Sequence, residues 1–239
     1  MRILSTSSRR VLLLASFFMT LTASPLASAA EWTPSGEQNG VQLYSKQAGG
    51  DALKYFRGVT RVKAPLKKVL AALLDRETFP EWFHNMREDV TLPDDNPDAS
   101  LCYIWMKGVW PTADRDTVAR ATVSQDAQTG VISIIVRSAE QHRVPLKKGR
   151  VRMPELYTGF FLRALSPHET EIQLEGQADP GGSIPSFLTN AVASDLPAKT
   201  LANLRARLET PDKVDLGVLD KVPFAVLSMK KIQLPEPGQ

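Results

Sequence analysis

The feature that most constrains this chain is an alternation of apolar and polar residues with a period of two, which recurs through residues 87–179. Its clearest stretch is 170–178, where one face carries Ile172, Leu174, Gly176 and Ala178 and the other carries Glu171, Gln173, Glu175 and Gln177. Because successive side chains of a strand point to opposite faces, this stretch predicts a strand with one buried and one wet face. Such strands are typical of antiparallel sheets.

Further strands are expected before this stretch. They cover residues 41–48, 53–62, 101–106, 117–124, 131–138, 150–153 and 160–165. Turn residues at 49–51 join the first two as a hairpin. Segment 101–106 is apolar on both of its faces, which predicts a strand that is covered on both sides or lines an interior space.

Two segments have helical periodicity instead. In 65–74 the apolar residues fall at intervals of three and four, at Leu66, Val69, Leu70, Leu73 and Leu74, which is one stripe of a helix. A turn-rich stretch at 179–183 precedes a second, longer helix that runs to 208. Pro197 is expected to kink or interrupt that helix. One long sheet with amphipathic helices indicates an α+β fold.

The first 29 residues are typical of an export signal. Basic residues at the start precede an apolar stretch over 11–23, and Ala27-Ser28-Ala29 supplies a cleavage site. An apolar stretch of about 13 residues suits a signal peptide and is short for a membrane span. We therefore expect cleavage near Ala29 and export to the periplasm. An uncleaved anchor is the alternative, and the choice between general secretory and twin-arginine export stays open.

The charge balance changes once this segment is set aside. The chain has 29 Lys and Arg against 26 Asp and Glu, and the excess of three is Arg2, Arg9 and Arg10. The mature chain is then neutral, which argues against a nucleic-acid partner because phosphate binding needs a basic surface. Its one cysteine, Cys102, allows no intrachain disulfide, and the three histidines lack metal-ligand spacing. No metal or cofactor is expected.

Several motifs, in order along the chain, resemble those of the START domain, a lipid-transfer domain of the Bet v 1-like helix-grip superfamily. They are Phe79-Pro80-Glu81-Trp82, Trp110-Pro111 with Arg115-Asp116, 149–153, 179–185, Asn190 and 200–205. The resemblance implies a curved antiparallel sheet wrapped around a long C-terminal helix, with a central tunnel that holds one lipid and catalyses no reaction. It covers about 35–208, so we expect a lipid-binding domain over 30–208. Residues 209–239 would be a tail packed on the domain, or else a lid or partner-binding segment.

Seven residues are candidates for contact with a ligand: Trp82, Tyr103, Trp105, Arg115, Asp116, Arg152 and Asn190. Aromatic side chains offer apolar surface with a polar edge, and arginine can pair with a carboxylate or phosphate. Each has a structural alternative. The tryptophans could be core residues, Arg115-Asp116 a structural ion pair, Arg152 a salt bridge at the rim, and Asn190 a bond between helix and sheet. Some members of the family place a further arginine inside the tunnel, where Ala121 stands here.

The sequence therefore predicts an exported monomer that encloses a lipid or other hydrophobic small molecule and makes transient contact with membranes. A second hypothesis is an enzyme, such as a cyclase or isomerase, that uses the same cavity with His84 or His142 as a base. A third is an interaction module that recruits a partner through residues 222–227.

Overall fold

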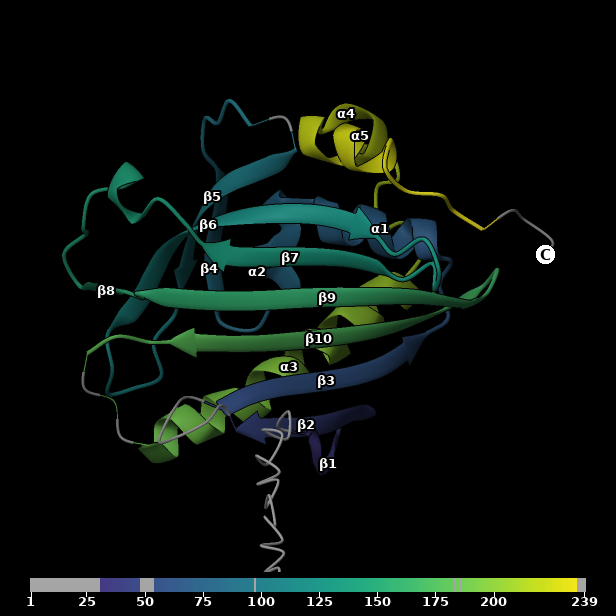
Figure 1. Cartoon of the computed structure of the whole chain (residues 1–239). Coiled ribbons are helices and arrows are strands. Elements are labelled where there is room, and N and C mark those ends of the chain that lie inside the picture. The colour runs from purple at the N-terminus through teal and green to yellow at the C-terminus, as the bar shows by residue number, and fades with distance from the viewer. Residues whose placement is uncertain (1–30, 48–53, 97, 183, 185, 236–239) are drawn as a thin grey trace, which may run out of the picture.

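A single curved sheet dominates the computed structural model, which describes residues 31–47, 54–96, 98–182, 184 and 186–235 (Figure 1). Its strands in the described residues are β1 (Thr33–Gln38), β2 (Val41–Gln47), β3 (Lys54–Val62), β4 (Met86–Thr91), β5 (Ala99–Met106), β6 (Asp114–Gln125), β7 (Ile132–Ser138), β8 (Arg150–Arg152), β9 (Glu155–Ser166) and β10 (Glu169–Asp179). Neighbouring strands run in the order β1-β2-β3-β10-β9-β7-β6-β5-β4 and are antiparallel throughout this path. Short β8 pairs with the start of β6 in parallel.

The strands expected from the alternation are all present, and the α+β prediction is confirmed. β10 shows the predicted pattern most clearly, since Ile172 and Leu174 are fully buried while Glu171 and Gln173 are only partly covered. The alternation did not reveal β1 or β4. β1 has the sequence Thr-Pro-Ser-Gly-Glu-Gln and is largely exposed, so its pairing with β2 rests on backbone hydrogen bonds and leaves no apolar pattern.

Two groups of helices cover the inner face of the sheet. Helix α1 (Leu66–Leu74) is followed by the 3₁₀ turn η1 (Arg76–Thr78) and short α2 (Phe79–Trp82). The long helix α3 (Ser186–Glu209) crosses β3 and β10 (Figure 1). It runs through Pro197 without ending there. Helix and sheet approach closely at Gly58 of β3, where a Cβ atom would lie 3.0 Å from the side chains of Pro197 and Leu201.

The chain after α3 packs against the domain. It forms two short helices, α4 (Val218–Lys221) and α5 (Pro223–Met229), beside α1 (Figure 1). Leu219, Ala225 and Ile232 are buried in the main core, and Gln233 exchanges hydrogen bonds with Gln125 at the far end of β6. No helix in the described ranges is long and apolar enough to cross a membrane.

Candidate functional site

A cavity of about 210 Å³ lies between the inner face of the sheet and the helices. The sheet lines it with apolar side chains that include Ile104, Met106, Ala121, Ile134 and Phe160. The helices add Leu73, Phe79, Leu196 and Phe224, and Phe83 contributes from the residue that follows α2. A concave, largely apolar space with a few polar groups is typical of binding sites for small hydrophobic molecules.

The period of two decides which residues of β5 face this cavity. Ile104 and Met106 line it, whereas their neighbours Tyr103 and Trp105 belong to the outer face of the strand. Tyr103 packs there in a second small apolar cluster with Leu101, Val118 and Val144. Both halves of the sequence expectation for 101–106 therefore hold, because the strand lines an interior space and is also covered on its outer side.

One ion pair is built into the cavity wall. Arg76 of η1 and Asp89 of β4 both line the cavity and are hydrogen bonded to each other, with Nε of Arg76 3.1 Å from Oδ1 of Asp89. Their side chains are 10% and 2% exposed. Burial raises the pKa of Asp89, and the charge of Arg76 opposes that rise. Cys102 lies beside the pair, and burial raises the pKa of its thiol to about 11, so the one cysteine is unreactive at neutral pH.

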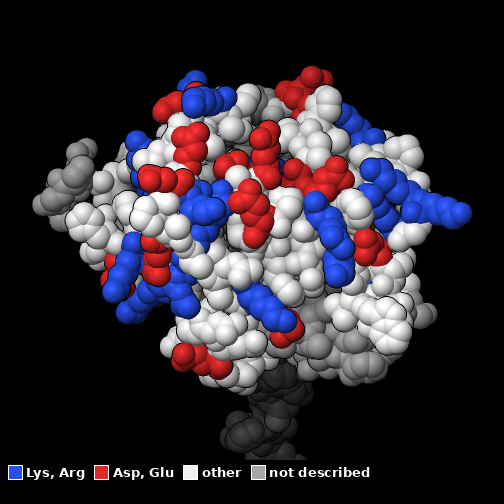
Figure 2. Space-filling view, turned by 180° about the vertical axis from the view of Figure 1, so that it is seen from behind, with Lys and Arg blue, Asp and Glu red and all other residues white. Residues whose placement is uncertain are grey.

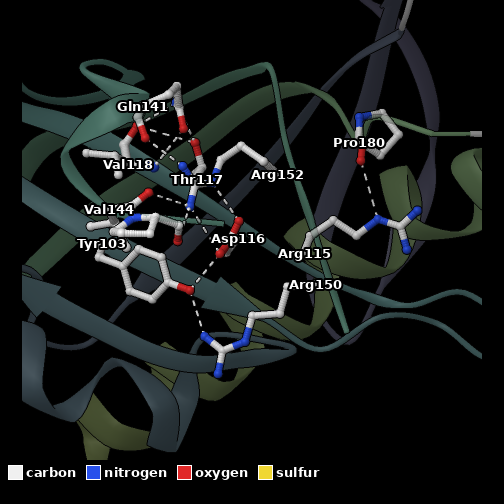
Figure 3. A network of polar contacts seen from close by, with 11 residues as sticks. Tyr103, Arg115, Asp116, Thr117, Val118, Gln141, Val144, Arg150, Arg152 and Pro180 are labelled. Carbon is white, nitrogen blue, oxygen red and sulfur yellow. Dashed lines mark hydrogen bonds and ion pairs between the residues drawn. The ribbon is translucent and has the colours of Figure 1, made fainter. Parts of the chain in front are cut away.

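A second arginine, Arg115, lines the cavity at the end where β6 begins. It is 8% exposed and donates hydrogen bonds to the backbone carbonyls of Pro180 and Ala113. Burial lowers its pKa, and the nearby charge of Asp114 opposes this effect. Figure 3 shows the Arg115 side chain directed towards Pro180 and away from Asp116. The expected alternative of an Arg115–Asp116 ion pair is wrong, because adjacent residues of a strand point to opposite faces.

Asp116 instead anchors a polar network on the outer face of the sheet (Figure 3). Arg152 of β8 donates from Nε to Oδ1 of Asp116 at 2.7 Å, and Tyr103 donates its hydroxyl to Oδ2 at 2.7 Å. Arg152 also donates to the carbonyls of Gln141 and Val144, which belong to residues 139–149, the covering segment between β7 and β8. Asp116 is 1% exposed, so this network ties β5, β6, β8 and the segment around the 3₁₀ turn η2 (Gln141–Arg143) into one unit.

Arg150 extends this network along the outer face. Its guanidinium lies 3.5 Å from the ring centre of Trp105 and donates to the Tyr103 hydroxyl at 2.6 Å. The indole of Trp105 donates to Asp114 at 2.8 Å. Burial and the bond to Asp116 raise the pKa of Tyr103 to about 12, although Arg150 opposes the rise. The polar groups of Tyr103 and Trp105 thus form hydrogen bonds within the protein itself.

Six of the seven candidates from the sequence have described side chains. Of these six, Arg115 lines the cavity and the other five do not. Tyr103, Trp105, Asp116 and Arg152 come together, but on the opposite face of the sheet. Trp82 is buried behind Phe79 and Phe83, with ring centres 4.7 Å and 5.8 Å away. The side chain of Asn190 lies outside the described residues. Their roles as ligand contacts stay predictions.

Sequence reasoning missed Arg76 and Asp89. The family resemblance located an interior arginine at position 121, where alanine stands, and Ala121 does line the cavity. Arg76 supplies a guanidinium to the same space from η1. The only hint in the sequence was position, because Arg76 stands two residues after Leu74, the last apolar residue of the α1 stripe. Asp89 lay in a strand that the alternation did not reveal.

Comparison with known proteins agrees with this geometry. The family model of the START domain matches residues 16–213. An uncharacterized protein of Pseudomonas aeruginosa is 32% identical over 183 residues, which cover 77% of this chain and 89% of the relative. The structure of a STAR-related lipid transfer protein fragment from Xanthomonas axonopodis has a TM-score of 0.66 and 29% identity, with 75% of this chain and 99% of that chain covered.

The human relatives are more distant. START domain-containing protein 10 of Homo sapiens is 25% identical over 150 residues, which are 62% of this chain and 50% of the human protein. The crystal structure of human STARD10 has a TM-score of 0.70 at 20% identity, covers 85% of this chain and 83% of that chain, and agrees in fold. The family model matches most of this chain, and the sheet, the long helix and the cavity are all present. This chain therefore belongs to the START domain family.

Proposed function

We propose that this protein is an exported carrier that encloses one hydrophobic ligand, a lipid or a sterol-like molecule, and shuttles it between membranes. The observation that carries the proposal is the apolar cavity between the sheet, α1, α3 and α5. Apolar surface gains about 25 cal/mol per Å² when it leaves water. A ligand face of about 300 Å² would thus contribute roughly 7 kcal/mol before ordering costs, which is close to the binding free energy of a micromolar complex.

Export is proposed from residues 1–29 alone, which lie outside the described residues and have the pattern of a signal peptide. The charges of the described chain favour a carrier that does not bind nucleic acid. Figure 2 shows basic and acidic side chains interspersed over one face of the molecule, which gives no continuous basic stripe there for a nucleic acid. A monomer that touches membranes briefly to load and release its ligand remains part of the proposal.

We further propose that the cavity binds without catalysis. An enzyme of this shape needs a titratable group that can reach the ligand. Neither His84 nor His142 is among the described residues that line the cavity. Asp89, which does line it, is held by Arg76. A cyclase or isomerase remains the alternative, and activity on a small substrate that vanishes in His84→Ala or His142→Ala would favour it.

The direct test is native mass spectrometry of the protein purified from its own host, followed by extraction of the bound lipid. We expect one copurifying hydrophobic molecule per chain. The variant Ala121→Phe, which places a ring in the cavity, should lose it. Thr122→Phe is the matched control, because Thr122 is the next residue of β6 and is exposed on the opposite face, so its complex should persist. A protein that is reproducibly empty and takes up no lipid in a transfer assay would overturn the proposal.

A further inference from the structure

Two buried arginines line the same cavity and differ in how their charges are balanced. Arg76 has the carboxylate of Asp89 as its partner. Arg115 has no carboxylate of the described residues within ion-pair distance, and it is bonded to backbone carbonyls instead. Asp116 is directed to the other face, where Arg152 holds it. The cavity wall therefore carries one buried positive charge that the described chain does not neutralise.

The nearest acidic neighbour does not remove this imbalance. Asp114 precedes Arg115 by one residue and accepts hydrogen bonds from the Trp105 indole at 2.8 Å and from the Gly108 backbone at 2.8 Å. Its influence on Arg115 is a Coulomb interaction without a hydrogen bond. Lys107, another basic residue at this end of the cavity, is exposed and adds positive potential. The charged groups around Arg115 thus favour an anion.

A buried guanidinium without a counter-charge costs several kcal/mol, unless a ligand supplies the charge. Arginine has five N–H donors in a planar fork, and the two carbonyls take only part of this capacity. A carboxylate or phosphate fits the remaining donors and forms charge-assisted hydrogen bonds. Arg115 therefore has the chemistry of an anion site at the end of an apolar cavity.

From these observations we infer that the ligand is an amphiphile with a negatively charged headgroup, a carboxylate or a phosphate, which binds Arg115 while its apolar part occupies the cavity. The distance along β6 from Arg115 to Ala121 is long enough for the apolar part of such a ligand. Arg115 and Ala121 share the inner face and are six residues apart, which is about 20 Å of strand. This inference rests on the proposed function and adds the chemical class of the ligand to it.

The test uses matched pairs of amphiphiles that differ in headgroup charge alone. Hexadecanoic acid is compared with hexadecanol, and a lysophosphatidic acid with the monoacylglycerol of the same chain. Binding is measured by displacement of a fluorescent fatty-acyl probe and by native mass spectrometry. We expect the wild-type protein to prefer the anionic member by about tenfold or more, because a hydrogen bond to a charged group contributes about 1.5–3 kcal/mol. The larger preference within the two pairs distinguishes a carboxylate from a phosphate headgroup.

Substitutions assign the preference to Arg115. In Arg115→Met the two members of a pair should bind with affinities within about twofold, and the neutral member should bind as in wild type. Arg150→Met removes a charge from the outer face of the neighbouring strand and should keep the preference. If Arg115→Met does not fold, Arg115→Lys provides the readout, because a lysine keeps the charge but loses the planar fork and should bind the anion more weakly.

The outcomes separate the two proposals. Equal binding of charged and neutral members by the wild-type protein would overturn the anionic headgroup and leave the carrier function standing. A preference that persists unchanged in Arg115→Met would also overturn it. Failure of every amphiphile to bind would likewise overturn the anionic headgroup, and it would contradict the proposed function itself if the protein also copurifies with no hydrophobic molecule.

Discussion

The two faces of β5 and β6 differ in how their side chains are arranged. On the outer face, charged and polar side chains are paired with other groups of the protein. Asp116, for example, accepts hydrogen bonds from both Arg152 and Tyr103. On the inner face, apolar side chains surround a space that they do not fill, and Arg115 meets it without a carboxylate of the described residues. The polar groups of the outer face are therefore matched within the described chain, whereas we propose that a ligand completes the inner face.

This difference explains why a polar cluster can look like a binding site in the sequence and still be structural. Tyr103, Trp105, Asp116 and Arg152 include the residue types that recognise headgroups, and the fold does bring them together. Their donors and acceptors, however, are used to fasten β8 and the covering segment onto the sheet. Substitutions on either face test this division.

Breaking the outer network should give the largest loss of stability. Asp116→Ala leaves Arg152 with a buried charge and no carboxylate, which costs about 3–5 kcal/mol for pairs of this kind. Urea unfolding of the variant measures the loss. Arg163→Ala, which removes an exposed ion pair with Glu171, is the control and should cost at most about 1 kcal/mol.

The same variant tests whether the outer network affects ligand binding on the inner face. Per folded molecule, Asp116→Ala should bind the ligand as the wild type does, because Asp116 is not among the described residues that line the cavity. A loss of ligand affinity that exceeds the loss expected from unfolded protein would show that the two faces are not separate.

Removing the ring of Phe224 should enlarge the inner space. Phe224 is the residue of α5 that lines the cavity. Phe224→Ala should lower the free energy of unfolding by about 1–3 kcal/mol, because the side chain is only partly buried. The preferred chain length in a series of fatty acids should shift to longer chains. Ile232→Ala is the matched control: Ile232 is buried in the same C-terminal segment but does not line the cavity. An equal shift in both variants would contradict the role of Phe224.

Acid should weaken the outer face when Asp116 takes up a proton. Burial raises the pKa of Asp116, but the hydrogen bonds and charge of Arg152 outweigh this effect and hold the pKa below its ordinary value of 3.8. A carboxylate with a lowered pKa in the folded state contributes stability that is present above pH 3.8 and is lost as the pH falls through the folded value. Asp116→Asn should therefore lose less stability than wild type over that fall, as measured by urea unfolding at a series of pH values. Parallel slopes in the two proteins would argue against the prediction.

The smallest effect is expected at Trp110, on the loop between β5 and β6. Its side chain is 88% exposed, so Trp110→Ala should change the free energy of unfolding by no more than about 0.5 kcal/mol. Thermal unfolding measures this. A loss of several kcal/mol would mean that Trp110 is covered in solution by a part of the protein that the described residues do not include.

The fold was predictable because its signals are periodic. The alternation in 170–178 and the stripe in 65–74 each determine a buried face without reference to the rest of the chain, and their elements appear close to the expected bounds. The site was less predictable, because a strand such as 101–106 with two apolar faces does not say which of them is inner. That choice depends on the curvature of the whole sheet, and it placed Ile104 rather than Tyr103 in the cavity.

The central claim is that the ligand lies inside the cavity, and a crystal structure of the ligand-bound protein tests it most directly. We expect electron density for one molecule along Ile104, Ala121 and Ile134, with its headgroup at Arg115. Density on the outer face beside Tyr103 and Arg152, with the cavity unchanged, would contradict the account.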